Sequence, residues 1–517
     1  MHDYNAAMHA EDFYLFRHQL VRDAAYDLQL PADRAKAHLW AMEALDRFAG
    51  GPAPNRMPML GEKDSPHPVD PFASGLARHA TAALEGEPPD AAALRRRRLD
   101  YLWRAAAHAG TNYRVSEAAD LFRRIFDDPD ENEPNRAEAA RLAADMLRVG
   151  GGGQQALPLY EAARELAHDH AFEVELALTL DRLGSQLREL GRMEQAEQTI
   201  RESIVHYRTV GERRGEARAL RSLSIVLQQT GRFDEAVAGI SLAMQINLEL
   251  QEDQGLAADL GTLANLHFFT GEFDKSEEYH LRALETERRS SIITYEGSTL
   301  ANLAILYSDT GRHDEAEELY HRAIEIHRQV GNRRSEGIAI GNLASLLHRT
   351  GRLAEARALY QDALEIHREC GNRRSQGVDL GHFAMLLQSE NDFAAAESMF
   401  RQALALHREV RNRRGEGITL GHLASLQEET GELEKAAETL EAAIELHRAV
   451  RNRRFEAGDG IDFGLLLLKL GRTDEARKQW QTAYAICEEL ITREELEGRK
   501  VAMRKACEAA GVPPLLP

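Results

Sequence analysis

The sequence predicts an all-α fold built as a solenoid of antiparallel helix pairs, and three observations carry that prediction. The 517-residue chain repeats itself every 40 residues. Within each repeat, apolar residues recur at the i, i+3, i+4 and i+7 spacing of two amphipathic helices. No segment alternates between apolar and polar residues with the period of two that is typical of a strand. We therefore expect essentially no sheet.

The repeat runs through eight units without a gap. One slot of the register holds Gly in seven units and Asn in one, and five residues later every unit has Ala or Ser. The slot residues are Gly191, Gly231, Gly271, Gly311, Gly351, Asn391, Gly431 and Gly471. Chance does not produce a register of this length, which indicates stacked structural units.

The unit around Asn342 shows how each repeat divides into two helices. Ile340, Leu343 and Leu347 share one face of the first helix. Gly351 ends that helix, because a helix terminus favours a residue that adopts left-handed angles. The second helix carries Leu353, Ala356, Leu359, Tyr360, Ala363 and Leu364 at the same spacing, and Gly371-Asn372 ends it.

This unit resembles the tetratricopeptide repeat. The residues at the family's offsets are Ile340, Leu343, Ala344, Leu347, Gly351, Ala356, Tyr360 and Ala363. The period is 40 residues rather than about 34, and a longer second helix ending in Asn-Arg-Arg replaces the terminal Pro of the pattern. The long form resembles the repeats of kinesin light chains, and more closely those of cell-polarity scaffolds that bind GoLoco-motif proteins. The shared string runs from Gly331 to Gly337 and from Gly341 to Ala344. The resemblance covers about Phe172 to Leu490 and implies a right-handed superhelix with its first helices along a concave groove.

The flanks of the array differ from the repeats, and we expect five parts in all. They are a helical segment over 1–50, a Pro- and Gly-rich linker over 51–90, degenerate repeat-like helices over 91–171, the eight repeats over 172–491, and a capping helix with its tail over 492–517. A terminal helix of this kind caps the open end of a solenoid.

The N-terminal segment carries a second resemblance. The stretch from Phe13 to Tyr26, FYLFRHQLVRDAAY, resembles the region that follows the nucleotide-binding module of bacterial signalling ATPases of the STAND class. In those proteins a tail of helical repeats comes next. The chain has no G-x-x-x-x-G-K-[ST] loop, so it lacks a phosphate cradle of that type. The resemblance implies that the chain corresponds to the sensor or scaffold tail of such a regulator, without its ATPase module.

Composition narrows the functional classes. The chain has 64 basic and 84 acidic residues, a net charge of −20, which argues against a nucleic-acid-binding surface as the main role. No run approaches the roughly 18 apolar residues of a membrane span, so we expect no membrane partner. The N-terminus lacks an export pattern. The three cysteines, Cys370, Cys487 and Cys507, lie far apart and form no disulfide framework, which favours a reducing cytoplasm.

Motifs for chemistry are mostly missing, so we expect no enzyme, no cofactor and no metal site. Gly458, Gly460 and Gly464 nearly form a dinucleotide fingerprint, but the spacing is one residue too long and no strand precedes it. One His recurs on each of four second helices, at His327, His367, His407 and His447. Neighbouring helices stand roughly 8–10 Å apart, which makes these residues a ladder rather than a metal cluster. Repeated Gly pairs such as Gly337 and Gly341 indicate close backbone approach between helices.

The first helices carry the candidate binding face. Arg334, Ile338, Asn342 and Ser345 share one side of their helix, and this side is not the apolar one. The corresponding stripe in other repeats supplies Arg, Asn and His. The candidate peptide-binding residues are Arg214, Arg218, Asn265, Asn302, Arg334, Asn342, Arg374, His382, Arg414 and His422.

This face predicts an extended, acidic peptide as the partner. Asn side chains donate and accept hydrogen bonds and therefore satisfy a free peptide backbone, and Arg forks suit carboxylates. In the polarity scaffolds that the repeats resemble, Arg and Asn of the corresponding face engage a long acidic segment. Two other roles for the arginines stay open: they bond helix C-terminal carbonyls, or they pair with Glu336, Glu416 and Glu456. We expect such a bracing role for Arg333, Arg373, Arg413 and Arg453.

Three functions compete at this point. The first is a non-enzymatic scaffold or adaptor in bacterial signalling. The second is a ligand- or peptide-sensing regulatory subunit that works with a separate ATPase, kinase or transcription factor. The third, an enzyme on a helical solenoid, has no candidate catalytic set in the sequence.

Overall fold

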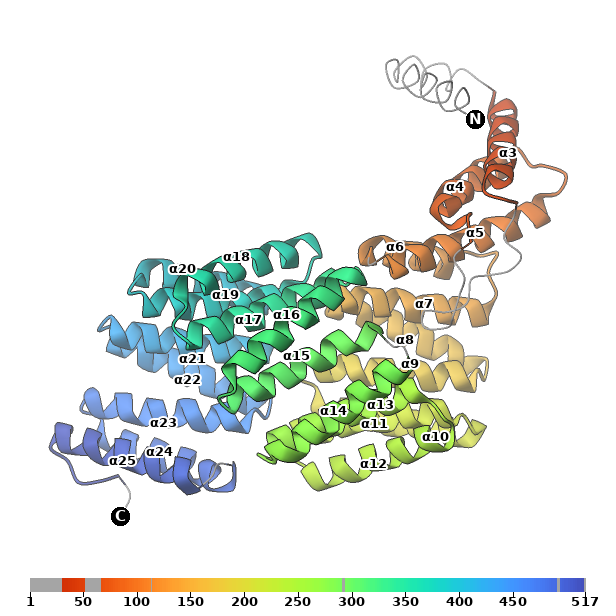
Figure 1. Cartoon of the computed structure of the whole chain (residues 1–517). Helices are drawn as coiled ribbons and strands as arrows, with labels where there is room; N and C mark the ends of the chain where they lie inside the picture. Colours follow the sequence, from red (N-terminus) through yellow and green to blue (C-terminus); the bar gives the residue numbers. More distant parts are fainter. Residues whose placement is uncertain (1–29, 52–66, 113, 291–292, 491–492, 516–517) are drawn as a thin grey trace. The chain divides into compact units, whose positions relative to one another are not determined.

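The computed structural model describes residues 30–51, 67–112, 114–290, 293–490 and 493–515. Within these ranges it contains 23 α-helices, one short 3-10 helix and no strand, so the all-α prediction is confirmed (Figure 1). The chain divides into two compact units, Met1–Met146 and Leu147–Pro517. Among the described helices, none combines the length and the apolarity needed to cross a bilayer.

The first unit is a group of irregular helices. Its elements are α3 (Pro31–Phe48), η1 (Asp70–Phe72), α4 (Ala73–Leu84), α5 (Ala91–Thr111), α6 (Val115–Phe126) and most of α7 (Glu133–Val149). Buried polar pairs join them: Tyr101 of α5 donates to Asp46 of α3 at 2.5 Å, and Arg104 Nε donates to Asp70 at 2.7 Å. The STAND resemblance over Phe13 to Tyr26 lies outside the described residues.

The linker expected over 51–90 is wrong for the part that the structure describes. Helix α4 occupies Ala73–Leu84, and its Leu76 and Ala80 are fully buried. The sequence suggested a loop because Pro and Gly flank the helix on both sides. Small residues repeated every three or four positions let this short helix pack closely against α3 and α5.

The second unit holds the repeats, and its helices lie side by side in antiparallel pairs (Figure 1). After α8 (Gly153–Asp169), the eight pairs are α9 (Glu173–Glu189) with α10 (Met193–Val210), α11 (Arg213–Gln229) with α12 (Phe233–Glu249), α13 (Asp253–Phe269) with α14 (Phe273–Arg289), α15 (Ile293–Asp309) with α16 (His313–Gln329), α17 (Arg333–Arg349) with α18 (Leu353–Glu369), α19 (Arg373–Ser389) with α20 (Phe393–Glu409), α21 (Arg413–Glu429) with α22 (Leu433–Ala449), and α23 (Arg453–Lys469) with α24 (Thr473–Leu490). Helix α25 (Arg493–Ala510) follows, and its Met503 and Cys507 complete the last core cluster.

The helix termini explain the fixed register. Gly351 ends α17 in the left-handed region, with φ of 81°, and Asn391 takes the same role after α19 with φ of 63°. At boundaries between a second helix and the next first helix an Asn can cap the following helix, as Asn332 does at the start of α17. The side chain of Asn332 accepts a hydrogen bond from the Ser335 backbone N–H at 3.1 Å.

The histidine ladder is a packing device between helices. His407 of α20 is buried, and its Nδ1 lies 3.1 Å from Nδ2 of the capping residue Asn412. A methyl group added at Gly377 of α19 would stand 2.8 Å from Cε1 of this ring, and one added at Gly415 of α21 would stand 2.7 Å from it. Each His ring therefore fills a notch that glycine leaves in an adjacent first helix.

This finding corrects the interpretation of the Gly pairs. The atoms that would meet a Cβ at Gly337 are side-chain atoms of His367 and Ile366, not backbone. At Gly341 they belong to the carboxylate of Asp379. The glycines make room for buried polar side chains rather than for a neighbouring helix backbone.

The notch predicts opposite effects for two Gly-to-Ala substitutions. Gly377→Ala would press a methyl group against His407 and lower stability by about 1–3 kcal/mol. Gly261→Ala is the control, because no atom lies within 4 Å of its added Cβ and Ala is about 1 kcal/mol better than Gly in a helix. Thermal unfolding of both variants checks this. An equal rise in Tm for both would contradict the notch.

A buried His at another slot gives a prediction about pH. Burial lowers the pKa of His280 to about 4, and its Nδ1 has no hydrogen-bond partner among the residues that the structure describes. Below its ordinary pKa of about 6.5 the unfolded chain binds a proton that the folded chain does not, so the free energy of unfolding falls as the pH falls from 6.5 towards 4. At pH 5 this effect lowers the free energy of unfolding by about 2 kcal/mol relative to its value near neutral pH.

The variant that tests this is His280→Phe, since Phe400 occupies the same slot in a later repeat. We expect its Tm to fall less than that of the unmodified chain between pH 7 and pH 5. Comparing the two chains is essential, because burial raises the pKa of Glu287 to about 7 and thereby favours the folded state at lower pH. Parallel pH profiles would show that His280 does not titrate as stated.

Candidate functional site

The first helices lie on the concave side of the solenoid. Consecutive first helices, such as α15, α17 and α19, pack against one another, whereas consecutive second helices make few or no contacts. Closer spacing on one side of a stack means that this side is the inside of the curve. The stripe that begins with Arg334 is therefore on the inner side.

Asparagines form the middle of this face. Asn302 and Asn342 occupy the same slot of neighbouring repeats, and Asn265 stands one turn further along its own helix. All three are partly exposed, and none has a hydrogen-bond partner among the described residues. Each amide is therefore available to both a donor and an acceptor of a ligand.

Two histidines continue the same slot. His382 Nδ1 lies 3.3 Å from the Ser345 hydroxyl of the preceding first helix. Burial lowers the pKa of His382, and burial together with the charge of His382 lowers that of His422. Both rings are neutral at pH 7 and offer hydrogen bonds rather than positive charge. Ile338 and Val378 add partly exposed apolar surface beside them.

The two arginines nearest the start of the array already have carboxylate partners. Arg218 Nε donates to Asp181 at 3.1 Å, and its Nη2 donates to the Tyr207 hydroxyl. The Asp181 side chain is 1 % exposed, so this pair belongs to the packing between repeats. Arg214 pairs with Glu252 but remains 65 % exposed.

The next three arginines face an earlier part of the array. Arg334 Nη1 donates to the carbonyl of Val149, and Arg374 Nη1 donates to the carbonyl of Glu189 at 3.5 Å. Both contacts span 185 residues of sequence. Arg414 has no hydrogen bond or ion pair among the described residues.

These contacts support bracing of helix C-terminal carbonyls for Arg334 and Arg374, although the helices belong to a distant part of the array. The other open role, pairing with the nearby glutamates, falls to different residues. Glu336 accepts from Arg328 and Arg333, and Glu416 accepts from Arg408.

The long-range contacts define a seam. We call this line of contact the seam. On one side of it lie the α7–α8 and α9–α10 turns, and on the other lie the turns that precede α17, α19, α21 and α23. A Cβ at Gly151 would lie 3.5 Å from the Gly371 carbonyl oxygen, and Arg451 pairs with Glu194 at 2.5 Å across 257 residues.

The seam is rich in positive charge. Burial is the main cause that lowers the pKa of Arg188 and of Arg334, and the charge of Arg374 acts in the same direction on both. Crowded protein atoms and the charge of Arg374 also lower the pKa of Arg414. Glu189 acts in the opposite direction on the pKa of both Arg188 and Arg334, and Cys370 does so on that of Arg334.

The seam was not predictable from a comparison of neighbouring repeats, because the residues that meet there lie in units far apart along the chain. The run Gly150 to Gly153 was a usable signal, because it gives a turn without side chains where another turn comes close.

The structure offers no group for metal binding among its described residues, where no three His, Cys, Asp or Glu side chains come together suitably. Three of the four ladder histidines, His367, His407 and His447, instead lie within hydrogen-bond distance of a capping asparagine. Two of them also lie close to a carboxylate: His367 Nε2 is 3.1 Å from Asp379 Oδ2, and His447 Nε2 is 3.2 Å from Asp459 Oδ2.

We expect substitution of Arg218 and of Arg214 to have very different effects on the stability of the fold. Arg218→Ala would leave the buried Asp181 carboxylate uncompensated and destabilise the fold by about 3 kcal/mol or more. Arg214→Ala removes only an exposed pair and should change stability by less than about 1 kcal/mol. Denaturant unfolding of the two variants measures this. Similar losses for both would show that Arg218 is not a packing residue.

Comparisons with known proteins agree with this architecture. Residues 175–239, 295–369 and 378–449 match the family model described as tetratricopeptide repeat. No curated protein matches the chain in sequence. Among solved structures, the chain is similar to a Rap protein complexed with competence and sporulation factor, at 12 % identity and a TM-score of 0.48, covering 73 % of this chain and 99 % of that one. It is also similar to BtubC from P. vanneervenii (18 % identity, TM-score 0.36, covering 43 % and 91 %) and to a putative kinesin light chain from Podosopora anserina (20 % identity, TM-score 0.31, covering 37 % and 95 %). The described part of the chain is a helical solenoid, and three stretches of it match the tetratricopeptide repeat.

Proposed function

We propose that the protein is a non-enzymatic scaffold or adaptor that binds an extended peptide along the concave side of its first helices. The observation that supports this most is the pair of amides at Asn302 and Asn342, which are partly exposed and lack partners among the described residues. Packed helices stand roughly 8–10 Å apart, which equals about three residues of extended chain. Neighbouring amides therefore meet every third residue of such a peptide.

The peptide is acidic in this proposal. Arg414 has no carboxylate partner of its own, and Arg374 is held only by a long contact to a carbonyl. A carboxylate side chain of the peptide would pair with either group. The neutral rings of His382 and His422 add hydrogen bonds without selecting for charge.

The cellular setting of the proposal is bacterial signalling in the cytoplasm. It rests on the resemblance over Phe13 to Tyr26, in a region outside the described residues. A regulatory subunit that senses a peptide or small ligand for a separate ATPase, kinase or transcription factor would use the same face.

Selection from a random peptide library tests the proposal with the full chain as bait. We expect enrichment of peptides rich in Asp and Glu. The double variant Asn302→Ala with Asn342→Ala should bind an enriched peptide at least tenfold more weakly, because each lost hydrogen bond is worth about 1 kcal/mol. Arg414→Gln should reduce the preference for acidic residues.

Gln402→Ala is the control, since this side chain is exposed on the second helix α20. It should leave the affinity unchanged. No enrichment above background, or equal binding by the double variant and the unmodified chain, would overturn peptide binding on the concave side.

A further inference from the structure

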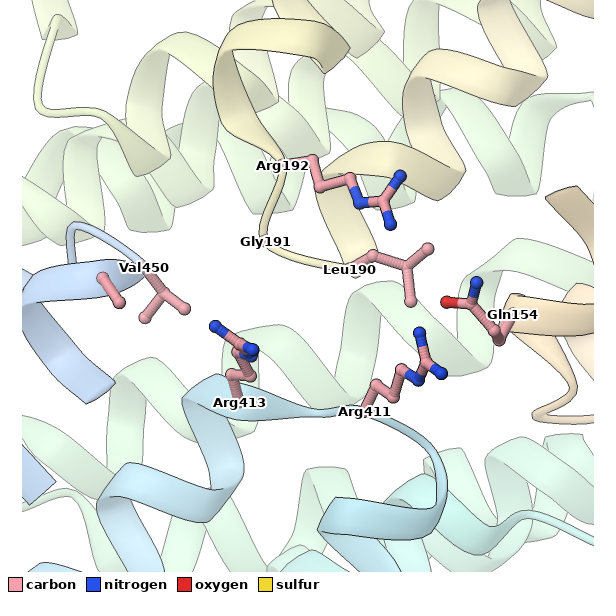
Figure 2. Close-up of a pocket in the computed structure, with 8 residues that line it drawn as sticks. Gln154, Leu190, Gly191, Arg192, Arg411, Arg413 and Val450 are labelled. Atoms are coloured by element: carbon pink, nitrogen blue, oxygen red, sulfur yellow. The ribbon is translucent and has the colours of Figure 1, made fainter. Parts of the chain in front are cut away.

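A polar cavity lies on the seam. It has a volume of about 240 Å³ and is bounded by the α9–α10 turn on one side and by the turns before α21 and α23 on the other. Figure 2 shows Arg411 and Arg413 extending from one turn towards the other, which carries Gly191 and Arg192. Gln154 closes a further side. Three guanidinium groups line this cavity, and no carboxylate does.

Arg192 has lost the partners that its counterparts keep. In another repeat, Arg312 at the same slot is clamped between Glu277 at 2.9 Å and Glu315 at 2.6 Å. Every other repeat with Arg at this slot has Glu three residues later, at Glu235, Glu315, Glu355 and Glu475. After Arg192 that position is Gln195, and the position of the preceding glutamate is Leu157. Arg192 makes no ion pair among the described residues.

Arg413 has lost a partner in the same way. The arginine at this slot reaches a glutamate on the following second helix in three other repeats: Arg213 to Glu249 at 3.2 Å, Arg333 to Glu369 at 2.8 Å, and Arg373 to Glu409 at 3.7 Å. For Arg413 that position is Ala449, which lines the cavity. The remaining nearby carboxylate, Glu416, pairs with Arg408.

Arg411 stands at a slot that holds glycine in three repeats and another residue in the other five. Its φ is 51°, and the same slot holds Gly331 and Gly371 in the two preceding repeats. A non-glycine residue in this region costs roughly 1 kcal/mol. Arg451, one repeat later, has the same conformation but pairs with Glu194. Arg411 has no such partner among the described residues.

Arg192, Arg411 and Arg413 are all exposed to solvent, and an anion placed between their three guanidinium groups would pair with positive charge from several sides. Arginine forks bind tetrahedral and planar oxyanions through paired hydrogen bonds. The volume suits a compact, multiply charged group rather than several residues of a peptide. Two adjoining cavities, of about 310 and 220 Å³, share Gly191 and Val450 with the first and give a larger molecule room to extend.

We propose that the seam cavity is a binding site for the phosphate groups of a small ligand, held by Arg192, Arg411 and Arg413. The shared chemistry is that of a di- or triphosphate, either inorganic or attached to a nucleoside. Bound phosphate joins the α9–α10 turn to the turn before α21. The ligand therefore stabilises the contact between distant parts of the array.

Isothermal titration calorimetry of the full chain with inorganic pyrophosphate, at low salt, is the first experiment. We expect saturable binding and a rise in Tm. Titration with ATP distinguishes the two sources: equal affinity assigns the site to phosphate groups alone, and a tighter fit assigns it to a nucleotide. Absence of heat with both probes at millimolar concentration would overturn the proposal.

The repeats supply matched variants. Arg192→Gln with Arg413→Gln should weaken pyrophosphate binding at least tenfold. Gln195→Glu with Ala449→Glu restores the carboxylates found in other repeats, keeps every arginine, and should abolish binding. Arg352→Gln is the control, because Arg352 is already paired with Glu317 and Glu355.

The control should leave the affinity unchanged. Loss of binding in the control, or unchanged binding in the carboxylate-restored variant, would show that the anion binds elsewhere. The restored variant also guards against misfolding, since its substitutions reproduce ion pairs that other repeats tolerate.

Discussion

The array depends on one buried polar side chain that recurs at the same slot in seven of its eight second helices. This residue changes along the chain from Tyr207 to Asn247, then Glu287, and then the four ladder histidines. Its partner often lies 12 residues later, on the next first helix: Asn247 donates to Asp259 at 2.7 Å, and Thr299 donates to Glu287 at 2.8 Å. A buried polar group without a partner costs about 1–3 kcal/mol. A slip of a single residue would break every such pair, so these contacts fix how each repeat sits on the next.

A fixed step between repeats also fixes where distant turns meet. The rotations of successive steps add up, and after several repeats the turn before α19 arrives beside the α7–α8 turn, where Gly151 stands close to Gly371. The seam is thus a consequence of the local packing, and the arginines at the start of the first helices are the side chains that reach across it. Arg334 and Arg374 donate to backbone carbonyls there, whereas Arg451 pairs with the side chain of Glu194.

Periodicity was enough to predict the helices, because each helix depends on residues within its own repeat. It also contained a signal for the histidine notch. Gly297, Gly337, Gly377 and Gly417 each precede a ladder histidine by 30 residues, and where the slot holds Tyr207, Asn247 or Glu287 the corresponding residue is Ala. The partners of the arginines were not predictable in this way. Whether Arg334 meets a ligand or the Val149 carbonyl depends on the curvature summed over several repeats, which no single repeat encodes. The N-terminal unit lacks the period, and a helix flanked by Pro and Gly was therefore mistaken for a linker.

In a repetitive chain, each residue can be compared with the residues at the same slot of the other repeats, and a residue that differs from them can then be examined for a functional reason. Some slots keep their pair in more than one repeat, as when Asp379 contacts His367 and Asp459 contacts His447. Gln195 and Ala449 are different, because each removes a carboxylate and leaves the arginine in place. Gln195 and Ala449 lie 254 residues apart in the sequence (449 − 195). The arginines that lack a carboxylate because of them, Arg192 and Arg413, nevertheless line the same cavity. Two such losses therefore meet at one space, to which Arg411 adds a third guanidinium group. This convergence is what a site needs if its missing charge is to come from a ligand.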